Sequence, residues 1–227
     1  MKNLVRPLTA EFLGTFGLVF IGAGAVVTDT ASGGELGLLG VAAAHAMVLS
    51  VLTTALMTIS GAHFNPAVTF AIWLARKIDG RRAGLYVVVQ LVAAVAAALL
   101  VKQLFPAGAG QAAAYGLPRV SSEIALAQGI VIEAILTVFL VSAVFGTAVS
   151  SEAPKVGGFG IGLVLLFDIL AGGPLTGAAM NPARAFGPAV AAVDWHGQIV
   201  YWVGPALGAA VAALLWSKVL LPQKTGG

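Results

Sequence analysis

Long apolar segments dominate this sequence. Six of them, at about residues 7–28, 36–58, 82–104, 124–147, 157–175 and 198–219, are long enough to cross the ~30 Å hydrocarbon core of a bilayer as α-helices. Only 9% of the residues are charged, against about 25% in a typical globular domain. The pattern predicts an all-α membrane protein with six transmembrane helices, folded as a single domain over residues 1–227.

The rest of the composition excludes several function classes. A net charge of +3 would suggest a nucleic-acid partner in a soluble protein, but here the basic residues flank apolar segments, so we expect none. The chain has no cysteine and three histidines, which excludes disulfides and thiol chemistry and argues against a metal site. We expect no cofactor, and no nucleophile–base constellation indicates an enzyme or any catalytic residue.

Two short motifs, Asn65-Pro66-Ala67 and Asn181-Pro182-Ala183, interrupt the pattern of spans. Asn is a strong helix N-cap, and Pro is tolerated at the first helical position because its missing N–H would be unpaired there anyway. Each motif opens an apolar run that ends near residue 76 or residue 193. About 12 residues cover only ~18 Å, so neither run can cross the membrane. We therefore predict two re-entrant half-helices that end midway.

The two half-helices belong to an internal repeat. Glu11 lies in the first span and Glu133 in the fourth, and Ser60-Gly61-Ala62 precedes the first motif as Thr176-Gly177-Ala178 precedes the second. Because each half holds three spans, the second half must enter the membrane with the opposite orientation. We predict an inverted 3+3 repeat, with halves at about 1–105 and 123–222, in which the N-termini of the half-helices point at each other.

The distribution of basic residues predicts the orientation in the membrane. With six spans, most of them fall on one side: Lys2, Arg6, Arg76, Lys77, Arg81, Arg82, Lys155, Lys218 and Lys224. Lys102 and Arg119 fall on the other side. A long Gly- and Ala-rich connection over residues 105–122 lies on that side too, and we expect it to be flexible. Because basic residues accumulate on the cytoplasmic side, both termini are predicted to be cytoplasmic.

Opposed half-helices determine what the centre of such a fold can hold. Each helix N-terminus carries a partial positive charge, and the Asn65 and Asn181 amides can add hydrogen-bond donors. This site favours a neutral hydrogen-bonding molecule and repels a cation. It also orients a water molecule as an acceptor, so that the water cannot pass a proton along the pore. Arg184 lies one turn further on; it either pairs with a buried carboxylate or, as we favour, lines the channel and screens cations.

The sequence allows more than one role for the other polar residues inside the spans. Glu11 and Glu133 could be proton carriers lining the pore, but we favour a structural role in which each accepts backbone N–H bonds from a re-entrant loop. Asp168 has no partner that the sequence identifies, although loop backbone is the favoured one. His63 fits a structural bond and a pore contact equally well. His45 alone would be interpreted as a core histidine.

Taken together, the paired motifs, the arginine after the second and the two glutamates resemble the aquaporin (major intrinsic protein) family over nearly the whole chain. The resemblance implies one water-conducting pore per subunit, a homotetramer in a lipid bilayer and an aromatic/arginine selectivity filter. By offset from the motifs, the filter positions are His45, Ile169, Ala178 and Arg184. This set is similar to that of plant tonoplast intrinsic proteins, which pass water and often ammonia, with urea or peroxide in some.

The resemblance therefore predicts a passive channel for water, and for small neutral solutes such as ammonia, that excludes protons and ions. A glycerol- or urea-type facilitator is one alternative, but Ala185 and His45 depart from the glycerol-conducting pattern. The other is an ion-coupled transporter with broken helices. It would need Glu11, Glu133 or Asp168 to bind a coupling ion, and the opposed positive dipoles disfavour a cation there.

Overall fold

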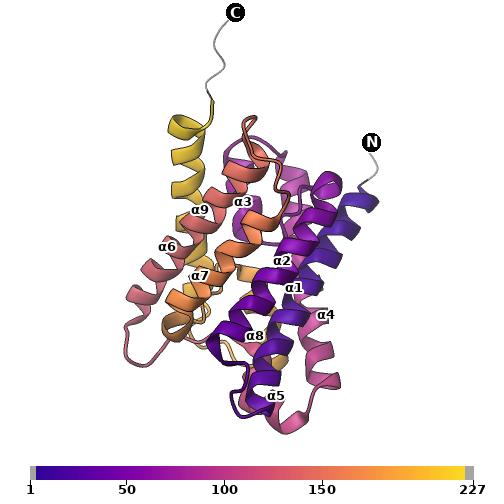
Figure 1. Cartoon of the computed structure of the whole chain (residues 1–227), viewed down its shortest axis with the longest axis vertical. Coiled ribbons are helices and arrows are strands. Elements are labelled where there is room, and N and C mark those ends of the chain that lie inside the picture. Colours follow the sequence, from indigo (N-terminus) through magenta and orange to yellow (C-terminus); the bar gives the residue numbers. More distant parts are fainter. Residues whose placement is uncertain (1–3, 223–227) are drawn as a thin grey trace, which may run out of the picture.

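The computed structural model describes residues 4–222, and its helices match the predicted spans to within a few residues (Figure 1). No strand occurs in this range, and the all-α membrane fold is confirmed. Among residues 4–222, six helices have the length and apolar character needed to cross a membrane. They are α1 (Val5–Ala31), α2 (Gly37–Ser60), α4 (Gly80–Leu104), α6 (Leu126–Val144) continued by the π-helical turn η2 (Phe145–Val149), α7 (Phe159–Thr176), and α9 (Val200–Leu215) continued by η3 (Trp216–Leu220).

Each of the two motifs begins a helix that is too short to cross. α3 (Pro66–Leu74) and α8 (Pro182–Ala192) have 9 and 11 residues, or about 14 and 17 Å of helix. Each begins after an extended asparagine that caps it. α3 packs mainly on α9 and α8 mainly on α4, and the two short helices also touch each other. Each half-helix is thus held chiefly by a span of the opposite half of the chain.

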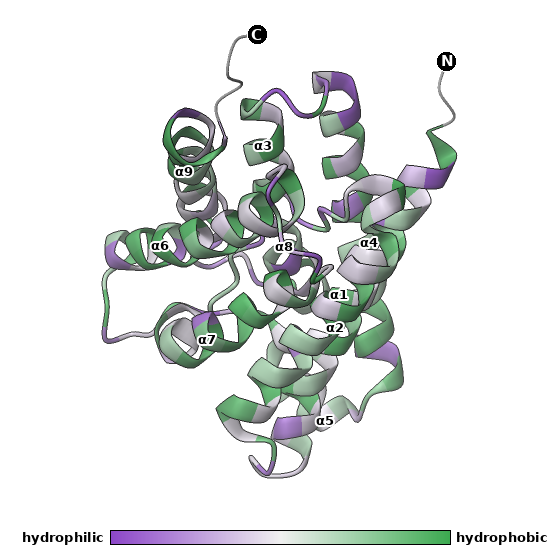
Figure 2. Ribbon diagram, turned by 45° about the horizontal axis from the view of Figure 1, so that its top comes forward, coloured by the Kyte–Doolittle hydropathy of each residue, from purple (hydrophilic) through white to green (hydrophobic). Residues whose placement is uncertain are grey.

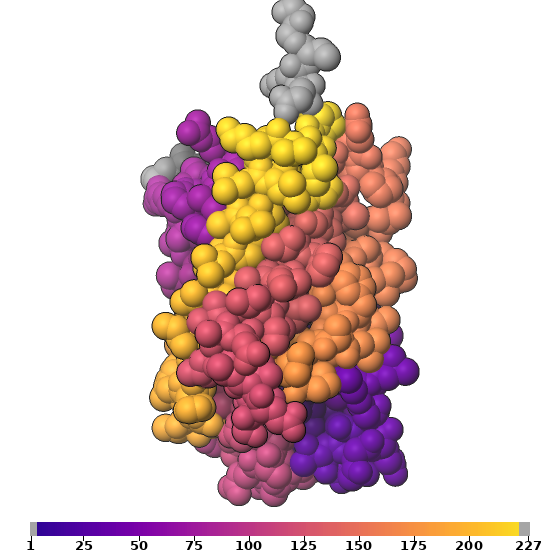
Figure 3. Space-filling view, turned by 90° about the vertical axis from the view of Figure 1, so that its left-hand side faces the viewer, coloured from indigo at the N-terminus to yellow at the C-terminus, as the bar shows by residue number. Residues whose placement is uncertain are grey.

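Small residues let the spans approach closely. α6 and α9 form one tightly packed pair, and α2 and α7 form another across the two halves. A Cβ on Gly208 would lie 2.1 Å from the carbonyl oxygen of Ala134, so only glycine fits at this crossing. Seen in space-filling form, α9, α6 and α7 lie side by side and tilted (Figure 3). Lipid tails are as apolar as the outer faces of the helices, so no hydrophobic effect drives the helices together. Close packing of this kind stabilises their association instead.

Hydrophilic residues concentrate in the connecting segments and near helix ends, and the outer faces of the spans are largely hydrophobic (Figure 2). α1 begins and η3 ends at the same end of the molecule, opposite α5 (Figure 1). Basic residues at or beside that end are Arg6, Arg76, Lys77, Arg81, Arg82, Lys155 and Lys218. Lys2 and Lys224, which the orientation prediction also used, lie outside the described residues.

The long connection over residues 105–122 differs from its prediction. Its central part is not an open loop but forms a short helix, α5 (Ala107–Ala112), and a helical turn, η1 (Ala114–Gly116). Tyr115 in η1 is only 8% exposed, and Leu117 packs against α8. The glycine- and alanine-rich sequence allows this compact course, because small residues let the segment lie on the ends of α1 and α8.

Candidate functional site

A narrow cavity runs between the two halves, with an accessible volume of about 20 Å³. That is enough for a water molecule, which needs ~10–15 Å³ by the same kind of measure. Both motif asparagines and Arg184 line it, together with side chains from four of the spans. The complete lining is Leu18, His45, Leu49, Ala62, His63, Asn65, Val68, Leu140, Val144, Ile161, Leu165, Ile169, Ala178, Ala179, Asn181 and Arg184.

The two half-helices meet through their capping asparagines. The Asn65 side chain accepts from the N–H of Ala67 at 2.8 Å and donates to the Met180 carbonyl at 2.8 Å. Asn181 accepts from Ala183 at 3.0 Å and donates to the Phe64 carbonyl at 2.9 Å. Each amide NH₂ has two N–H groups, so one remains for a molecule in the cavity. Pro66 and Pro182 occupy the first helical positions, as predicted.

The segments before the asparagines have an unusual and repeated backbone. Ala62 and Phe64 have φ of 50° and 51°, and Ala178 and Met180 have φ of 44° and 51°. This left-handed conformation is costly for residues that carry a Cβ, at about 1–2 kcal/mol each. Something outside these segments must therefore hold them in place.

Two fully buried glutamates supply that support. Glu11 accepts the backbone N–H groups of His63 and Phe64 at 3.0 and 2.8 Å. Glu133 accepts those of Ala179 and Met180 at 2.9 and 2.6 Å. Neither glutamate is among the residues that line the cavity. Both accept hydrogen bonds from the re-entrant backbone, which is the geometry that the structural interpretation expects.

Two tyrosines complete the support in the same way in both halves. Tyr86 on α4 donates to the carbonyl of Ser60 at 2.9 Å, and Tyr201 on α9 donates to the carbonyl of Thr176 at 2.8 Å. Ser60 and Thr176 each end a span, and each hydroxyl accepts a backbone N–H two residues further on. These phenols thus satisfy carbonyls that a helix leaves unpaired at its C-terminus.

All four predicted filter residues line the same cavity. Arg184 is 8% exposed and donates from one guanidinium nitrogen to the carbonyl of Gly116 at 2.8 Å. Within residues 4–222 no carboxylate lies within salt-bridge distance of it, which removes the alternative of a buried ion pair. His45 donates from Nδ1 to the carbonyl of Val41 at 2.9 Å, so Nε2 is the acceptor in the neutral ring.

The remaining candidates fall in different places. His63 does both of the things considered for it: its Nδ1 contacts the Thr69 hydroxyl at 3.1 Å, and the residue lines the cavity. Asp168 is 1% exposed, and its Oδ2 has no hydrogen-bond partner in the described structure. The expected bond from Asp168 to loop backbone is therefore not made by that oxygen, and Asp168 is not among the cavity-lining residues.

Sequence reasoning missed Gly116 and the two tyrosines. A tyrosine in an apolar span resembles ordinary packing, although Tyr86 and Tyr201 stand at nearly the same distance after the two motif asparagines, 21 and 20 residues. Gly116 left no comparable signal, because the contact is made by its backbone carbonyl. Any residue type has that carbonyl, so only the fold of η1 reveals it.

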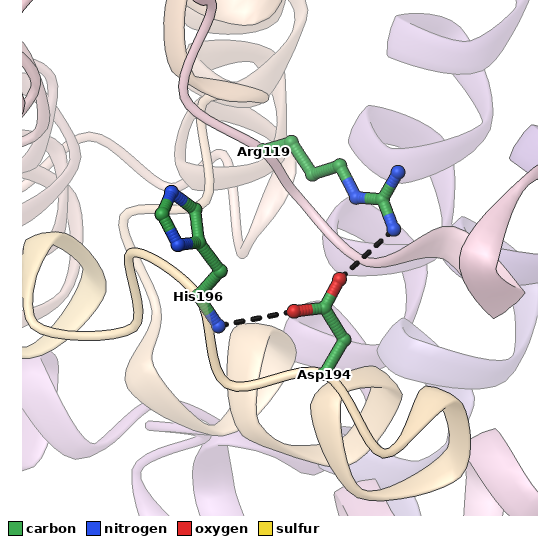
Figure 4. Close-up of polar contacts among 3 residues, drawn as sticks. All are labelled: Arg119, Asp194 and His196. Carbon is green, nitrogen blue, oxygen red and sulfur yellow. Dashed lines mark hydrogen bonds and ion pairs between the residues drawn. The ribbon is translucent and has the colours of Figure 1, made fainter.

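An exposed polar cluster lies outside the cavity (Figure 4). Arg119, which follows η1, forms a 2.9 Å ion pair with Asp194, which follows α8. The other oxygen of Asp194 accepts the backbone N–H of His196 at 3.0 Å. The His196 N–H, and then Arg119, hold the pKa of the Asp194 carboxyl below its usual value. The cluster joins the segment after η1 to the segment after α8.

Comparisons with known proteins agree with this geometry. Residues 1–216 match the family described as Major intrinsic protein. The chain is 40% identical to "Probable aquaporin TIP3-2" of Arabidopsis thaliana over 96% of this chain and 85% of the relative, and 39% identical to "Aquaporin TIP4-4" of Zea mays over 96% and 88%. An aquaglyceroporin from Plasmodium falciparum, solved by X-ray methods, has the same fold, with a TM-score of 0.83, 24% identity and coverage of 96% and 97%. The chain therefore belongs to the major intrinsic protein family and is an integral, multi-pass membrane protein.

Proposed function

We propose that this protein is a passive channel for water and not an enzyme. The observation that carries the proposal is the meeting of two half-helix N-termini at one cavity, with Asn65 and Asn181 lining it. Each asparagine has one amide N–H left, so a water molecule can accept from both at the midpoint. Names of relatives such as "Aquaporin TIP4-4" support the same conclusion.

The electrostatics of the cavity favour neutral molecules. Two helix N-termini contribute partial positive charges of about half a unit each, and Arg184 adds a full charge. A cation entering would meet these charges with no carboxylate facing it, since Glu11 and Glu133 are engaged by backbone N–H groups. A water molecule that accepts from both asparagines directs its own hydrogens away from them, which interrupts a proton wire.

We assign the residues accordingly. The pore centre is formed by Asn65, Pro66, Ala67, Asn181, Pro182 and Ala183, and the selectivity filter by His45, Ile169, Ala178 and Arg184. Glu11 and Glu133 are structural carboxylates. The whole chain acts as one channel domain, built from repeat halves at about 1–105 and 123–222.

Ammonia is the proposed second permeant. Ile169 and Ala178 place aliphatic groups at the filter, which lowers the cost of passing a molecule that is less well hydrated than water. His45 offers Nε2 as an acceptor. A glycerol- or urea-type facilitator is not favoured by this pattern. An ion-coupled transporter is not favoured either, because the crossed asparagine bonds tie the two halves together and oppose the rocking that such a transporter needs.

We also propose a homotetramer with both termini in the cytoplasm. The tetramer is implied by the resemblance to aquaporins. The orientation is supported by the accumulation of basic residues at the end where α1 begins and η3 ends. Protease accessibility of tags at the two termini in sealed vesicles tests the orientation, and the mass of the detergent-solubilised protein tests the assembly.

Stopped-flow light scattering of proteoliposomes tests the function. We expect water permeability well above that of empty liposomes, non-saturating and unchanged by imposed proton or sodium gradients. The same vesicles challenged with ammonia, urea and glycerol should rank ammonia first among the solutes. Transport that saturates at low substrate concentration and follows an ion gradient would instead establish the coupled transporter.

A further inference from the structure

The filter arginine is held by a turn that lies outside the cavity. Arg184 donates to the carbonyl of Gly116, the last residue of η1. Ala114, Tyr115 and Gly116 have φ of 45°, 54° and 80°. Two of these three residues carry a Cβ, for which the left-handed conformation is unfavourable. The direction of the Gly116 carbonyl therefore depends on what surrounds η1.

Two packed surfaces fix part of this turn. A Cβ on Gly116 would lie 2.6 Å from the Cα of Ala23, so the turn rests directly on the backbone of α1. On its other side the Tyr115 ring packs with Ala98 of α4 and Ala191 of α8. The Tyr115 ring thus lies between η1 and the C-terminal end of the second half-helix.

Lys102, near the end of α4, contacts both of these elements. Its ammonium nitrogen is 2.8 Å from the carbonyl oxygen of Ala191 and 5.1 Å from the centre of the Tyr115 ring. Ala191 lies in the last turn of α8, where carbonyls have no partner within the helix and the dipole is negative. One charged group therefore caps α8 and makes a cation–π contact with η1.

The C-terminus of the first half-helix has cations from its own segment of the chain. α3 is followed in the chain by Arg76 and Lys77, so basic residues stand at its own C-terminus. α8 is followed by Val193 and Asp194, and Asp194 is an anion. Lys102 on α4 thus supplies a charge that the local sequence lacks. It does so at the half-helix that carries Arg184.

We propose that Lys102 is a positioning residue for the filter. It holds the Tyr115 ring against the end of α8, so that the Gly116 carbonyl keeps the Arg184 guanidinium at the wall of the cavity. Without the ammonium group, η1 relaxes and Arg184 loses its fixed place, which widens the filter. The proposal depends on the proposed function, because it concerns the selectivity of the same channel.

The test compares the ratio of urea to water permeability in proteoliposomes. Lys102→Met keeps an unbranched side chain as far as Cε and removes the ammonium group that makes both contacts. We expect it to raise the ratio about three- to tenfold, as loss of a cation–π contact and a charged hydrogen bond would allow. Lys102→Arg should restore the ratio to within about twofold. Lys155→Met removes an exposed cation at the opposite end of the molecule and is the matched control, with no change expected.

A double-mutant cycle separates positioning from general packing. If Lys102 acts through Arg184, then Lys102→Met should add nothing to the ratio in an Arg184→Val background. Tyr115→Leu provides an independent test, because it removes the ring while leaving Lys102 able to cap α8. It should raise the ratio in the same direction, whereas Tyr115→Phe keeps the ring and should not.

The outcomes are distinct. An unchanged ratio in Lys102→Met, or an equal rise in the Arg184→Val background, overturns the proposal. If Lys102→Met does not insert, an unchanged ratio in Tyr115→Leu overturns it and a raised ratio supports it. Wild-type vesicles no more permeable to water than empty ones would refute the proposed function instead.

Discussion

The two halves of the molecule share a scaffold and differ in chemistry. In both, a buried glutamate binds two backbone N–H groups of the re-entrant segment, a tyrosine caps the span before it, and an asparagine donates across to the other half. The position three residues after the asparagine is Val68 in the first half and Arg184 in the second. Two residues before it stand His63 and Ala179. All four of these residues line the cavity.

The repeat constrains some of these residues and not others. The glutamate, tyrosine and asparagine that hold the unusual backbone recur in both halves, because both re-entrant segments have left-handed residues one and three positions before the asparagine. Side chains that only face the cavity are free to diverge. The residues that hold the re-entrant backbone are therefore alike in the two halves. At the positions of Val68 and Arg184 the cavity-facing side chains differ between the halves, and only the second half contributes an arginine.

The largest expected effect is the loss of a buried glutamate. Glu11→Ala and Glu133→Ala each leave two buried N–H groups without a partner, and each should lower the free energy of unfolding by about 3–5 kcal/mol. Each glutamate also accepts from one side chain, Gln90 in the first half and Thr176 in the second. Because each site therefore loses three donors, the losses should agree to within about 1 kcal/mol. Thermal unfolding in detergent measures both. A clear loss in only one half would break the symmetry claimed for the scaffold.

Removal of the asymmetric charge should change selectivity and leave the fold intact. Arg184→Val makes the second half resemble the first at this position, where Val68 stands. We expect water flow to persist and the cation leak to rise at least tenfold, equivalent to about 1.4 kcal/mol of barrier. Patch-clamp or dye-based leak assays on the same vesicles measure it. Val68→Ala is the matched control, and an unchanged leak in Arg184→Val would remove the arginine from the filter.

A smaller effect is expected at His45, the histidine of the proposed filter. His45→Phe removes the ring acceptor, and ammonia permeability should fall about threefold more than water permeability, as loss of one hydrogen bond would produce. Parallel ammonia and water measurements give the ratio. His63→Phe changes the other cavity-lining histidine, which belongs to the first half. If both substitutions lowered the two permeabilities equally, the histidines would serve packing alone.

The smallest effect concerns the exposed ion pair of Arg119 and Asp194. Because the pKa of Asp194 is lowered in the folded protein, its contribution to stability is present above the usual pKa and is lost as the pH falls through the lowered value. Asp194→Asn should therefore reduce the melting temperature slightly at pH 7 and not at all in strong acid. High salt should reduce the difference at pH 7. A difference that grew in acid would contradict this assignment.

The sequence predicted the helices and the half-helices well, because length, apolar content and Asn-Pro capping are local properties. The pairing of Glu11 and Glu133 with re-entrant backbone could also be inferred from their equivalent places in the repeat. The holding of Arg184 by Gly116 could not, because it depends on three successive left-handed residues in a segment without periodicity. The predicted bond from Asp168 to loop backbone could not be placed from the sequence either, and the Oδ2 of Asp168 has no hydrogen-bond partner among the described residues.

Each half-helix packs on a span of the opposite half, and this arrangement has a consequence for biosynthesis. α3 is made early, yet the element that it packs on most is α9, the last span to be made. The first three spans therefore cannot complete their own structure when they leave the ribosome. Assembly must wait until almost the entire polypeptide has been synthesised. A chain that ended before α9 would leave the α9-facing surface of α3 unpacked.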